Sequence, residues 1–87
     1  MKKIRIIIRG NVQGVFFRKN VCDLAKELNV NGYVMNIEDY VQAVFIGSED
    51  KVNVLLEFCA KGPEGAKVKS IEMENYLGDE IEGFEVR

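Results

Sequence analysis

The chain begins with apolar and charged residues in alternation. Within residues 3–9, Ile4, Ile6 and Ile8 fall on one side of an extended chain, and the other side holds Arg5, Ile7 and Arg9. A two-residue period of this kind is typical of a strand with one buried face. We therefore predict a strand over residues 3–9.

The pattern then changes to a helical period. Apolar residues recur at intervals of four, three, one and three positions, at Phe17, Val21, Leu24, Ala25 and Leu28. This spacing predicts an amphipathic helix that ends near Asn29, and Asn31-Gly32 supplies a turn after it.

A hairpin and a second helix follow. Residues 33–36 and 41–46 are rich in Val, Tyr, Phe and Ile, which predicts two strands joined by a tight connection. Ser48 stands where the N-cap of a helix is expected, and the Lys-Gly-Pro sequence at 61–63 ends that helix.

The predicted elements define a fold class. With two further strands around residues 68–76 and 84–86, the order is strand, helix, strand, strand, helix, strand and a short final strand. This is the βαββαβ order of the ferredoxin-like α+β sandwich, an antiparallel sheet with both helices on one face. A chain of 87 residues holds one such core, so we expect a single domain over residues 1–87.

The composition narrows the class of protein. With 47% hydrophobic residues, 30% charged residues and one proline, the chain is typical of an ordered globular domain. The amino-terminal apolar run is too short and too charged for a signal peptide or a membrane span, so we expect a cytoplasmic protein without a membrane partner. Histidine is absent, and Cys22 and Cys59 are far apart, so we expect two reduced, half-buried cysteines and no metal site.

The charges are segregated along the chain, although the net charge is only −2. Every charged residue before Asp23 is basic, and every charged residue from Glu72 to Glu85 is acidic. One interpretation is a solvated surface on which the two segments attract each other; the other is a local positive potential that attracts a small anion. We expect no nucleic-acid partner, because the chain is acidic overall and its middle strands lack an aromatic RNA-stacking pattern.

Residues 10–18, Gly-Asn-Val-Gln-Gly-Val-Phe-Phe-Arg, carry the candidate chemistry. Gly10 and Gly14 permit a sharp turn that aims backbone N–H groups at a point before the helix, where the helix dipole attracts oxyanions. On the glycines alone, such a turn is more often a plain connection. Arg18 favours an anion site, because a cation at the positive end of a helix is unfavourable unless a negative group compensates it.

The same nine residues resemble the first signature of the acylphosphatase family, Gly-x-Val-Gln-Gly-Val-x-Phe-Arg, at every specified position. Residues 32–36, Gly-Tyr-Val-Met-Asn, resemble the start of its second signature, and residues 83–87, Gly-Phe-Glu-Val-Arg, are similar to its last strand. The resemblance covers almost the whole chain. It implies hydrolysis of an acyl phosphate to a carboxylate and phosphate.

The resemblance also implies roles for individual residues. The arginine that matches Arg18 holds the phosphate, and the asparagine that matches Asn36 positions the attacking water. The loop contributes backbone N–H groups to the phosphate, from Val12, Gln13, Gly14, Val15, Phe16 and Phe17. Arg18 and these N–H groups take the role of a magnesium ion, so we expect no cofactor. We also expect a monomer whose other ligands are inorganic phosphate or similar small oxyanions.

The chain departs from the family pattern in its hairpin. The family pattern has a turn glycine four residues after the asparagine, and Tyr40 stands at that position here. The interval from Asn36 to Gly47, which matches the pattern's later glycine, is also one residue shorter than in the pattern. We therefore predict a shortened turn at Asp39-Tyr40, which would displace Asn36 by about an ångström and slow the reaction. The alternative function is then a catalytically slow regulatory module that binds phosphate or carbamoyl phosphate. The sequence leaves the distance between Arg18 and Asn36 open.

Overall fold

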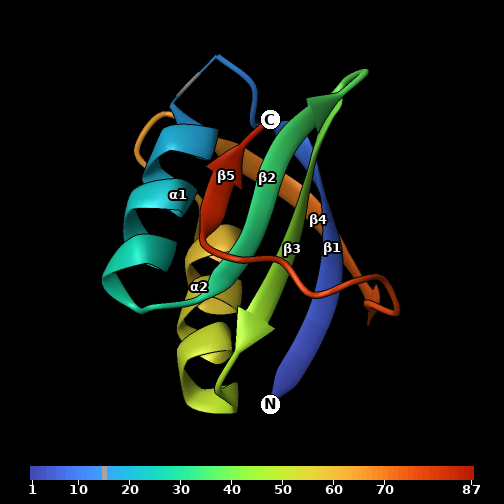
Figure 1. Ribbon diagram of the computed structural model, residues 1–87. Coiled ribbons are helices and arrows are strands. Elements are labelled where there is room, and N and C mark those ends of the chain that lie inside the picture. Colours follow the sequence, from blue (N-terminus) through green and yellow to red (C-terminus); the bar gives the residue numbers. More distant parts are fainter. Residues whose placement is uncertain (15) are drawn as a thin grey trace.

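The computed structural model describes residues 1–14 and 16–87 of the chain (Figure 1). Its elements are β1 (Lys2–Asn11), α1 (Phe17–Glu27), β2 (Asn31–Ile37), β3 (Tyr40–Gly47), α2 (Glu49–Lys61), β4 (Lys67–Asn75) and β5 (Phe84–Val86). The predicted order is confirmed, and both helices lie on the same face of the sheet (Figure 1). The fold is the predicted ferredoxin-like α+β sandwich with a short additional strand.

The strands form one sheet in the order β4-β1-β3-β2-β5. The pairs β1 with β3, β1 with β4 and β2 with β3 are antiparallel. The short β5 pairs with β2 in parallel, so the sheet is mixed at this edge and not antiparallel throughout. Because β3 separates β1 from β2, the loop after β1 and the residues of β2 are brought together only by the tertiary fold.

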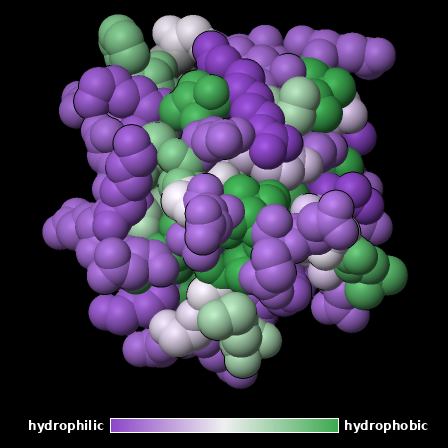
Figure 2. All heavy atoms as spheres, viewed as in Figure 1, coloured by the Kyte–Doolittle hydropathy of each residue, from purple (hydrophilic) through white to green (hydrophobic). Residues whose placement is uncertain are grey.

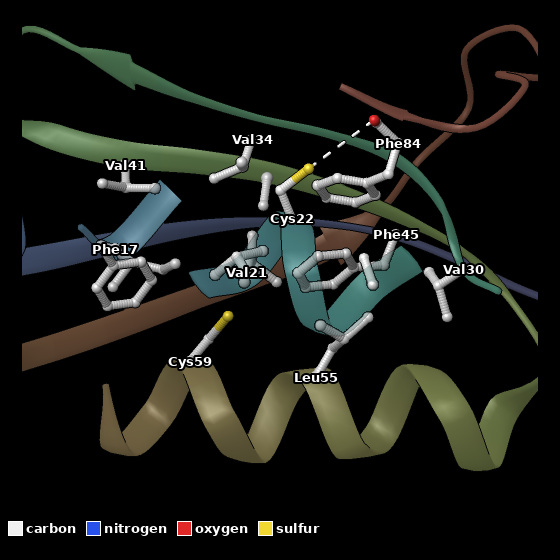
Figure 3. Close-up of a cluster of buried hydrophobic side chains, with 14 of the residues drawn as sticks. Phe17, Val21, Cys22, Val30, Val34, Val41, Phe45, Leu55, Cys59 and Phe84 are labelled. Carbon is white, nitrogen blue, oxygen red and sulfur yellow. Dashed lines mark hydrogen bonds between the residues drawn. The ribbon is translucent and has the colours of Figure 1, made fainter. Parts of the chain in front are cut away.

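The core lies between the sheet and the two helices (Figure 3). In β1 every second residue is buried, as the alternation predicts, and each helix contributes residues at helical spacing. The largest fully buried side chains include Ile6, Ile8, Phe45 and Leu55. Phe45 also stacks on Phe84 at a centroid distance of 6.0 Å, which attaches the edge strand β5 to the core.

The segregated charges meet on the outer face of the sheet. Because β1 and β4 are antiparallel neighbours, Arg5 Nη2 lies 2.6 Å from Glu74 Oε1, and Arg9 Nε lies 3.1 Å from Glu72 Oε2. Exposed pairs of this kind contribute only about 0–1 kcal/mol each. The interpretation as two attracting segments is therefore confirmed for these residues. Arg18 forms no ion pair with the side chain of a described aspartate or glutamate.

The hairpin turn differs from the prediction. Ile37 and Tyr40 face each other as the last pair of the β2–β3 ladder, so the turn consists of Glu38 and Asp39 and not of Asp39-Tyr40. Glu38 has the positive φ, 51°, that a turn glycine usually supplies. The left-handed conformation costs an L residue about 1–2 kcal/mol. The hairpin thus keeps a tight two-residue turn without its glycine.

The predicted ends of α2 are confirmed. Ser48 is the N-cap residue, although its side chain makes no capping hydrogen bond, and Gly62 with φ 78° is the C-cap residue. A hydrogen bond from Ser48 lowers the pKa of Asp50. Glu49 and Asp50 both lie in the first turn, so the positive end of this helix dipole already has negative partners from its own chain.

The two cysteines are more deeply buried than the predicted half-buried state. Both are free thiols, Cys59 has no exposed surface and Cys22 is 7% exposed. In Figure 3, Cys59 points from α2 toward the side chains of the core, and a dashed line joins the Cys22 sulfur to the backbone oxygen of Phe84.

Burial raises the pKa of the Cys59 thiol from its ordinary value of 9.0 to about 12. Between these values the folded chain retains a proton that the unfolded chain releases, so the free energy of unfolding should fall as the pH rises. The contribution is complete below pH 9 and decreases by up to about 1.4 kcal/mol per pH unit above it. Urea titrations at neutral pH and at about pH 10 should show a larger loss for wild type than for Cys59→Ala. Equal losses would contradict a buried, protonated thiol.

The outer face of the sheet is only partly polar. In Figure 2 hydrophilic side chains cover most of the visible surface, with hydrophobic atoms between them. A second small cluster of buried side chains lies on this sheet, formed by Tyr33, Val44 and Ile46.

In the described part of the chain, no helix has the length and apolar character needed to cross a membrane.

Candidate active site

One pocket collects the residues that the sequence identifies as candidates. It has a volume of about 400 Å³ and lies between the loop after β1, the first turns of α1 and the ends of β2 and β5. Both Arg18 and Asn36 line it. The described residues of the predicted loop also line it, namely Val12, Gln13, Gly14, Phe16 and Phe17. Val15, predicted to contribute a backbone N–H, lies outside the described residues.

Glycine is required at the two loop positions, Gly10 and Gly14, for different structural reasons. Gly10 has φ 133°, and a Cβ there would lie 2.2 Å from the backbone oxygen of Lys67, so a side chain would force β1 and β4 apart. Gly14 has φ 75°, lines the pocket and would meet nothing within 4 Å if it carried a Cβ. At Gly14 the glycine therefore provides the backbone conformation and leaves the main chain open to a ligand. The predicted positive-φ loop is confirmed at these two positions.

The amino end of α1 has no negative partner from the described chain. Phe16 is the N-cap residue, its side chain makes no capping hydrogen bond, and the first turn contains no acidic residue. The helix α2 differs, because it begins with Glu49 and Asp50. The first N–H groups of a helix lack intrahelical acceptors and carry about half a positive charge in total. The start of α1 is therefore suited to bind an oxyanion in the pocket.

Arg18 is oriented by the end of the chain. Its Nη1 donates a hydrogen bond to the backbone oxygen of Arg87 at 2.9 Å. Arg87 is itself held by its backbone N–H, which donates to the oxygen of Val34 at 2.8 Å, and by its guanidinium, which lies 4.1 Å from the ring centroid of Tyr33. One N–H of Arg18 is thus used for orientation. The other N–H groups of the guanidinium remain able to form a bidentate contact with an oxyanion.

Asn36 occupies an unusual position for a polar side chain. It lies two residues after the buried Val34 on β2, so the strand alternation directs it to the helix-facing side of the sheet. Its Oδ1 is buried and accepts no hydrogen bond from any described group. An unpaired buried acceptor costs about 1–3 kcal/mol, and buried polar atoms are almost always paired. Asn36 is also one of the residues that line the pocket.

Gln13 has a role that the sequence did not reveal. Its Nε2 donates hydrogen bonds to the backbone oxygens of Glu38 at 3.1 Å and Tyr40 at 2.9 Å. These two bonds attach the loop after β1 to the hairpin turn, just beyond Asn36. The sequence analysis assigned Gln13 only a backbone N–H, because a contact across 25 to 27 residues leaves no local pattern.

A charged pair lies at the rim of the pocket. Lys19 Nζ lies 2.7 Å from Asp23 Oδ2, at the i,i+4 spacing of a helix, and both residues line the pocket. The hydrogen bond to Asp23 raises the pKa of Lys19. Among the described pocket residues, Arg18 is therefore the cation that is not paired with an aspartate or glutamate side chain. Elsewhere in residues 1–14 and 16–87, His, Cys, Asp and Glu form no group of three or more that could hold a metal ion.

The fold and the pocket together define a class of protein. The protein is a small α+β domain of the ferredoxin-like class, in which the glycine loop, the start of α1 and an arginine meet in one pocket. The family model of acylphosphatase matches residues 4–86, and the chain belongs to the acylphosphatase family. The members of this family are hydrolases that act on acid anhydrides.

Individual relatives agree with this assignment. An acylphosphatase of Haloarcula marismortui is 38% identical over 86 residues, which is 98% of this chain and 94% of the relative. The solved structure of an acylphosphatase from Coxiella burnetii superimposes with a TM-score of 0.92 at 34% identity, over 99% of this chain and 92% of that one. The acylphosphatase structure from Bacillus subtilis has a TM-score of 0.92 at 30% identity, over 100% and 99%. Family and fold support acyl phosphate hydrolysis in general.

The link between Gln13 and the hairpin can be tested by its effect on turnover. We expect Gln13→Ala to lower kcat for an acyl phosphate about tenfold and to change KM less than about threefold, because the loop would remain while the position of Asn36 would relax. Steady-state kinetics measure both constants. Asn53→Ala is a matched control, since this amide lies on the exposed side of α2 and accepts a bond from Lys2. A purely structural role for Gln13 would lower stability and leave kcat of the folded enzyme unchanged.

Proposed function

We propose that the chain hydrolyses acyl phosphates in this pocket, with Arg18 and loop N–H groups binding the phosphoryl group and Asn36 orienting the attacking water. One observation carries the proposal: Asn36, whose buried Oδ1 has no hydrogen-bond donor among the described residues, lines the same pocket as Arg18. An acceptor in this state binds a water through the water's own O–H. The water is then held beside the cation that attracts the phosphoryl group.

The binding step uses electrostatic attraction. The phosphoryl oxygens accept hydrogen bonds from the start of α1, from the loop around Gly14 and from the guanidinium of Arg18. These groups are oriented before the substrate arrives, because Arg87 holds Arg18 and the left-handed Phe16 begins the helix. Preorganised donors of this kind stabilise the charge on the equatorial oxygens of the transition state.

The chemical step is an in-line displacement at phosphorus. The water oxygen forms a bond to phosphorus as the bond from phosphorus to the acyl oxygen breaks, and the electron pair of that bond leaves with the carboxylate. The proton of the water passes to a phosphate oxygen or to bulk water, because the amide of Asn36 is not a base near neutral pH. The products are a carboxylate and inorganic phosphate. A carboxylate is a weak base, so its departure needs no general acid.

The hairpin geometry supports hydrolysis over the alternative of a slow regulatory module. That alternative depended on a displacement of Asn36 by an altered turn. The turn at Glu38 and Asp39 remains a two-residue connection, and Gln13 attaches it to the loop. Asn36 lines the pocket, and its Oδ1 has no hydrogen-bond donor among the described residues.

The proposal extends to partners and location. We expect an acyl phosphate as substrate, inorganic phosphate as ligand and no cofactor, in a cytoplasmic monomer. The basic residues Arg5 and Arg9 are paired with glutamates of β4, which supports the absence of a nucleic-acid partner.

The proposed function is tested by an assay with synthetic acyl phosphates in the presence of a metal chelator. We expect hydrolysis far above the spontaneous rate, unchanged by the chelator and inhibited by inorganic phosphate in competition with substrate. A rate equal to spontaneous hydrolysis would refute the proposal. Loss of activity on chelation would refute the assignment of charge stabilisation to Arg18 and the loop N–H groups.

A further inference from the structure

The pocket has an apolar border that the proposed chemistry does not use. Phe16 and Val86 line the pocket, and their side chains are 75% and 48% exposed. The other large hydrophobic residues exposed in the described chain do not line it; they are Met1, Val54, Met73 and Leu77. Two exposed apolar side chains thus lie beside the residues that would bind the phosphoryl group.

Val86 is directed to the pocket by the pairing of β5. It lies two residues after Phe84, so both side chains project from the same face of the strand, and Phe84 points into the core beside Phe45 (Figure 3). The hydrogen bond from Arg18 to the backbone oxygen of Arg87 keeps this end of β5 against the first turn of α1. Val86 therefore lies next to Arg18 at the wall of the pocket.

Phe16 is held at the pocket in a strained conformation. Its φ of 58° and ψ of 25° are left-handed, and an aromatic L residue is rare in this region. Its backbone oxygen accepts two hydrogen bonds from Asn20, one from the backbone N at 3.0 Å and one from Nδ2 at 2.9 Å. A large apolar side chain that is both strained and exposed points to a use at this site.

The charged pair at the rim of the pocket, Lys19 and Asp23, disfavours a substrate whose acyl group carries a second negative charge. Lys19 is paired with Asp23, so an acyl group that carries its own carboxylate would compete with Asp23 for this lysine. An uncharged acyl group meets no such competition. The pocket volume of about 400 Å³ is also in the range of small-molecule sites and exceeds the needs of a phosphate ion.

We propose that Phe16 and Val86 form an acyl subsite that selects acyl phosphates with an aromatic acyl group over those with a carboxylate-bearing acyl group. This inference rests on the proposed function of the pocket. The ring of the acyl group packs between Phe16 and Val86 while the phosphoryl group contacts Arg18. Aromatic rings gain from such packing both by loss of exposed apolar area and by ring–ring contact.

The test compares kcat/KM for benzoyl phosphate, acetyl phosphate and succinyl phosphate. Val86→Thr keeps the shape and strand propensity of valine and replaces a methyl group by a hydroxyl, and Phe16→Asn places a residue that tolerates positive φ. We expect the ratio of benzoyl to acetyl phosphate to fall at least about fivefold in each variant. Leu77→Thr is the matched control, since Leu77 is 92% exposed outside the pocket and its replacement should leave the ratio unchanged.

The outcomes separate the subsite from the proposed function. Hydrolysis of all three substrates with an unchanged ratio in Val86→Thr and Phe16→Asn would overturn the subsite and leave the proposed function standing. A wild-type preference for succinyl phosphate over benzoyl phosphate would also overturn it. Absence of hydrolysis with every substrate would overturn both. Circular dichroism spectra that match wild type establish that the variants are folded.

Discussion

Replacement of Arg18 by alanine should remove inhibition by inorganic phosphate and lower kcat/KM for an acyl phosphate by roughly 10³-fold or more. The physical reason is that Arg18 is half-buried, lines the pocket and forms no ion pair with a described aspartate or glutamate side chain, so its remaining N–H groups are available to the phosphoryl group. Both binding and the transition state depend on this charge. Steady-state kinetics with phosphate as a competitive inhibitor measure the two effects together.

Arg5→Ala is the matched control for Arg18→Ala. It removes the same charge, but Arg5 is paired with Glu74 on the outer face of the sheet, so kcat/KM should stay within about twofold of wild type. Arg18→Lys should recover only part of the loss, because an ammonium group cannot reproduce the bidentate geometry of a guanidinium. Retention of phosphate inhibition in Arg18→Ala would contradict the assigned role.

Replacement of Asn36 by alanine should lower kcat about 10²- to 10³-fold, the loss expected when one oriented hydrogen-bonding group is removed from a transition state. The inhibition constant for inorganic phosphate should stay within about twofold, since Arg18 and the loop remain. This separation distinguishes a residue that orients water from one that binds phosphate. Asn75→Ala, at the exposed end of β4, should change neither constant.

The same variant should not lose stability. Oδ1 of Asn36 is a buried acceptor without a donor among the described residues, so its removal eliminates an unfavourable group and should raise the free energy of unfolding by up to about 1 kcal/mol. Urea unfolding of wild type and Asn36→Ala measures the difference. If the variant is instead destabilised and its phosphate affinity falls with kcat, Asn36 is a structural residue and the assignment is wrong.

The charge pattern illustrates how far local sequence can be interpreted. The clustering of basic residues before Asp23 was compatible with either a solvated surface or an anion site. The antiparallel pairing of β1 with β4 assigns Arg5 and Arg9 to the first of these, because it brings glutamates of β4 beside them. Arg18 lies in the first turn of α1, outside the sheet, and no glutamate of β4 is paired with it.

The hairpin shows a prediction that was wrong by one residue. The sequence revealed a missing turn glycine, but the position of the turn depends on which residues of β2 and β3 face each other. That register is determined by pairing along the whole strand, so that Val34 and Ala43 face each other and Asn36 faces Val41. The turn therefore falls at Glu38 and Asp39, and Asn36 keeps its place at the pocket.

The sequence by itself determined the order of elements, the faces of β1 and α1 that are buried, and the glycine loop with Arg18. These features depend on residues close together in the chain, whose periodicity, turn conformation and capping are local physics. The role of Asn36 was implied by the resemblance to the acylphosphatase family. Only the tertiary structure decided that Arg18 and Asn36 share a pocket, that Gln13 attaches the loop to the hairpin, that Val86 lines the pocket and that Arg87 accepts a hydrogen bond from Arg18. These contacts join segments far apart in the chain, and they form because burial of the common core aligns β1, β2 and β5 in one sheet beneath α1.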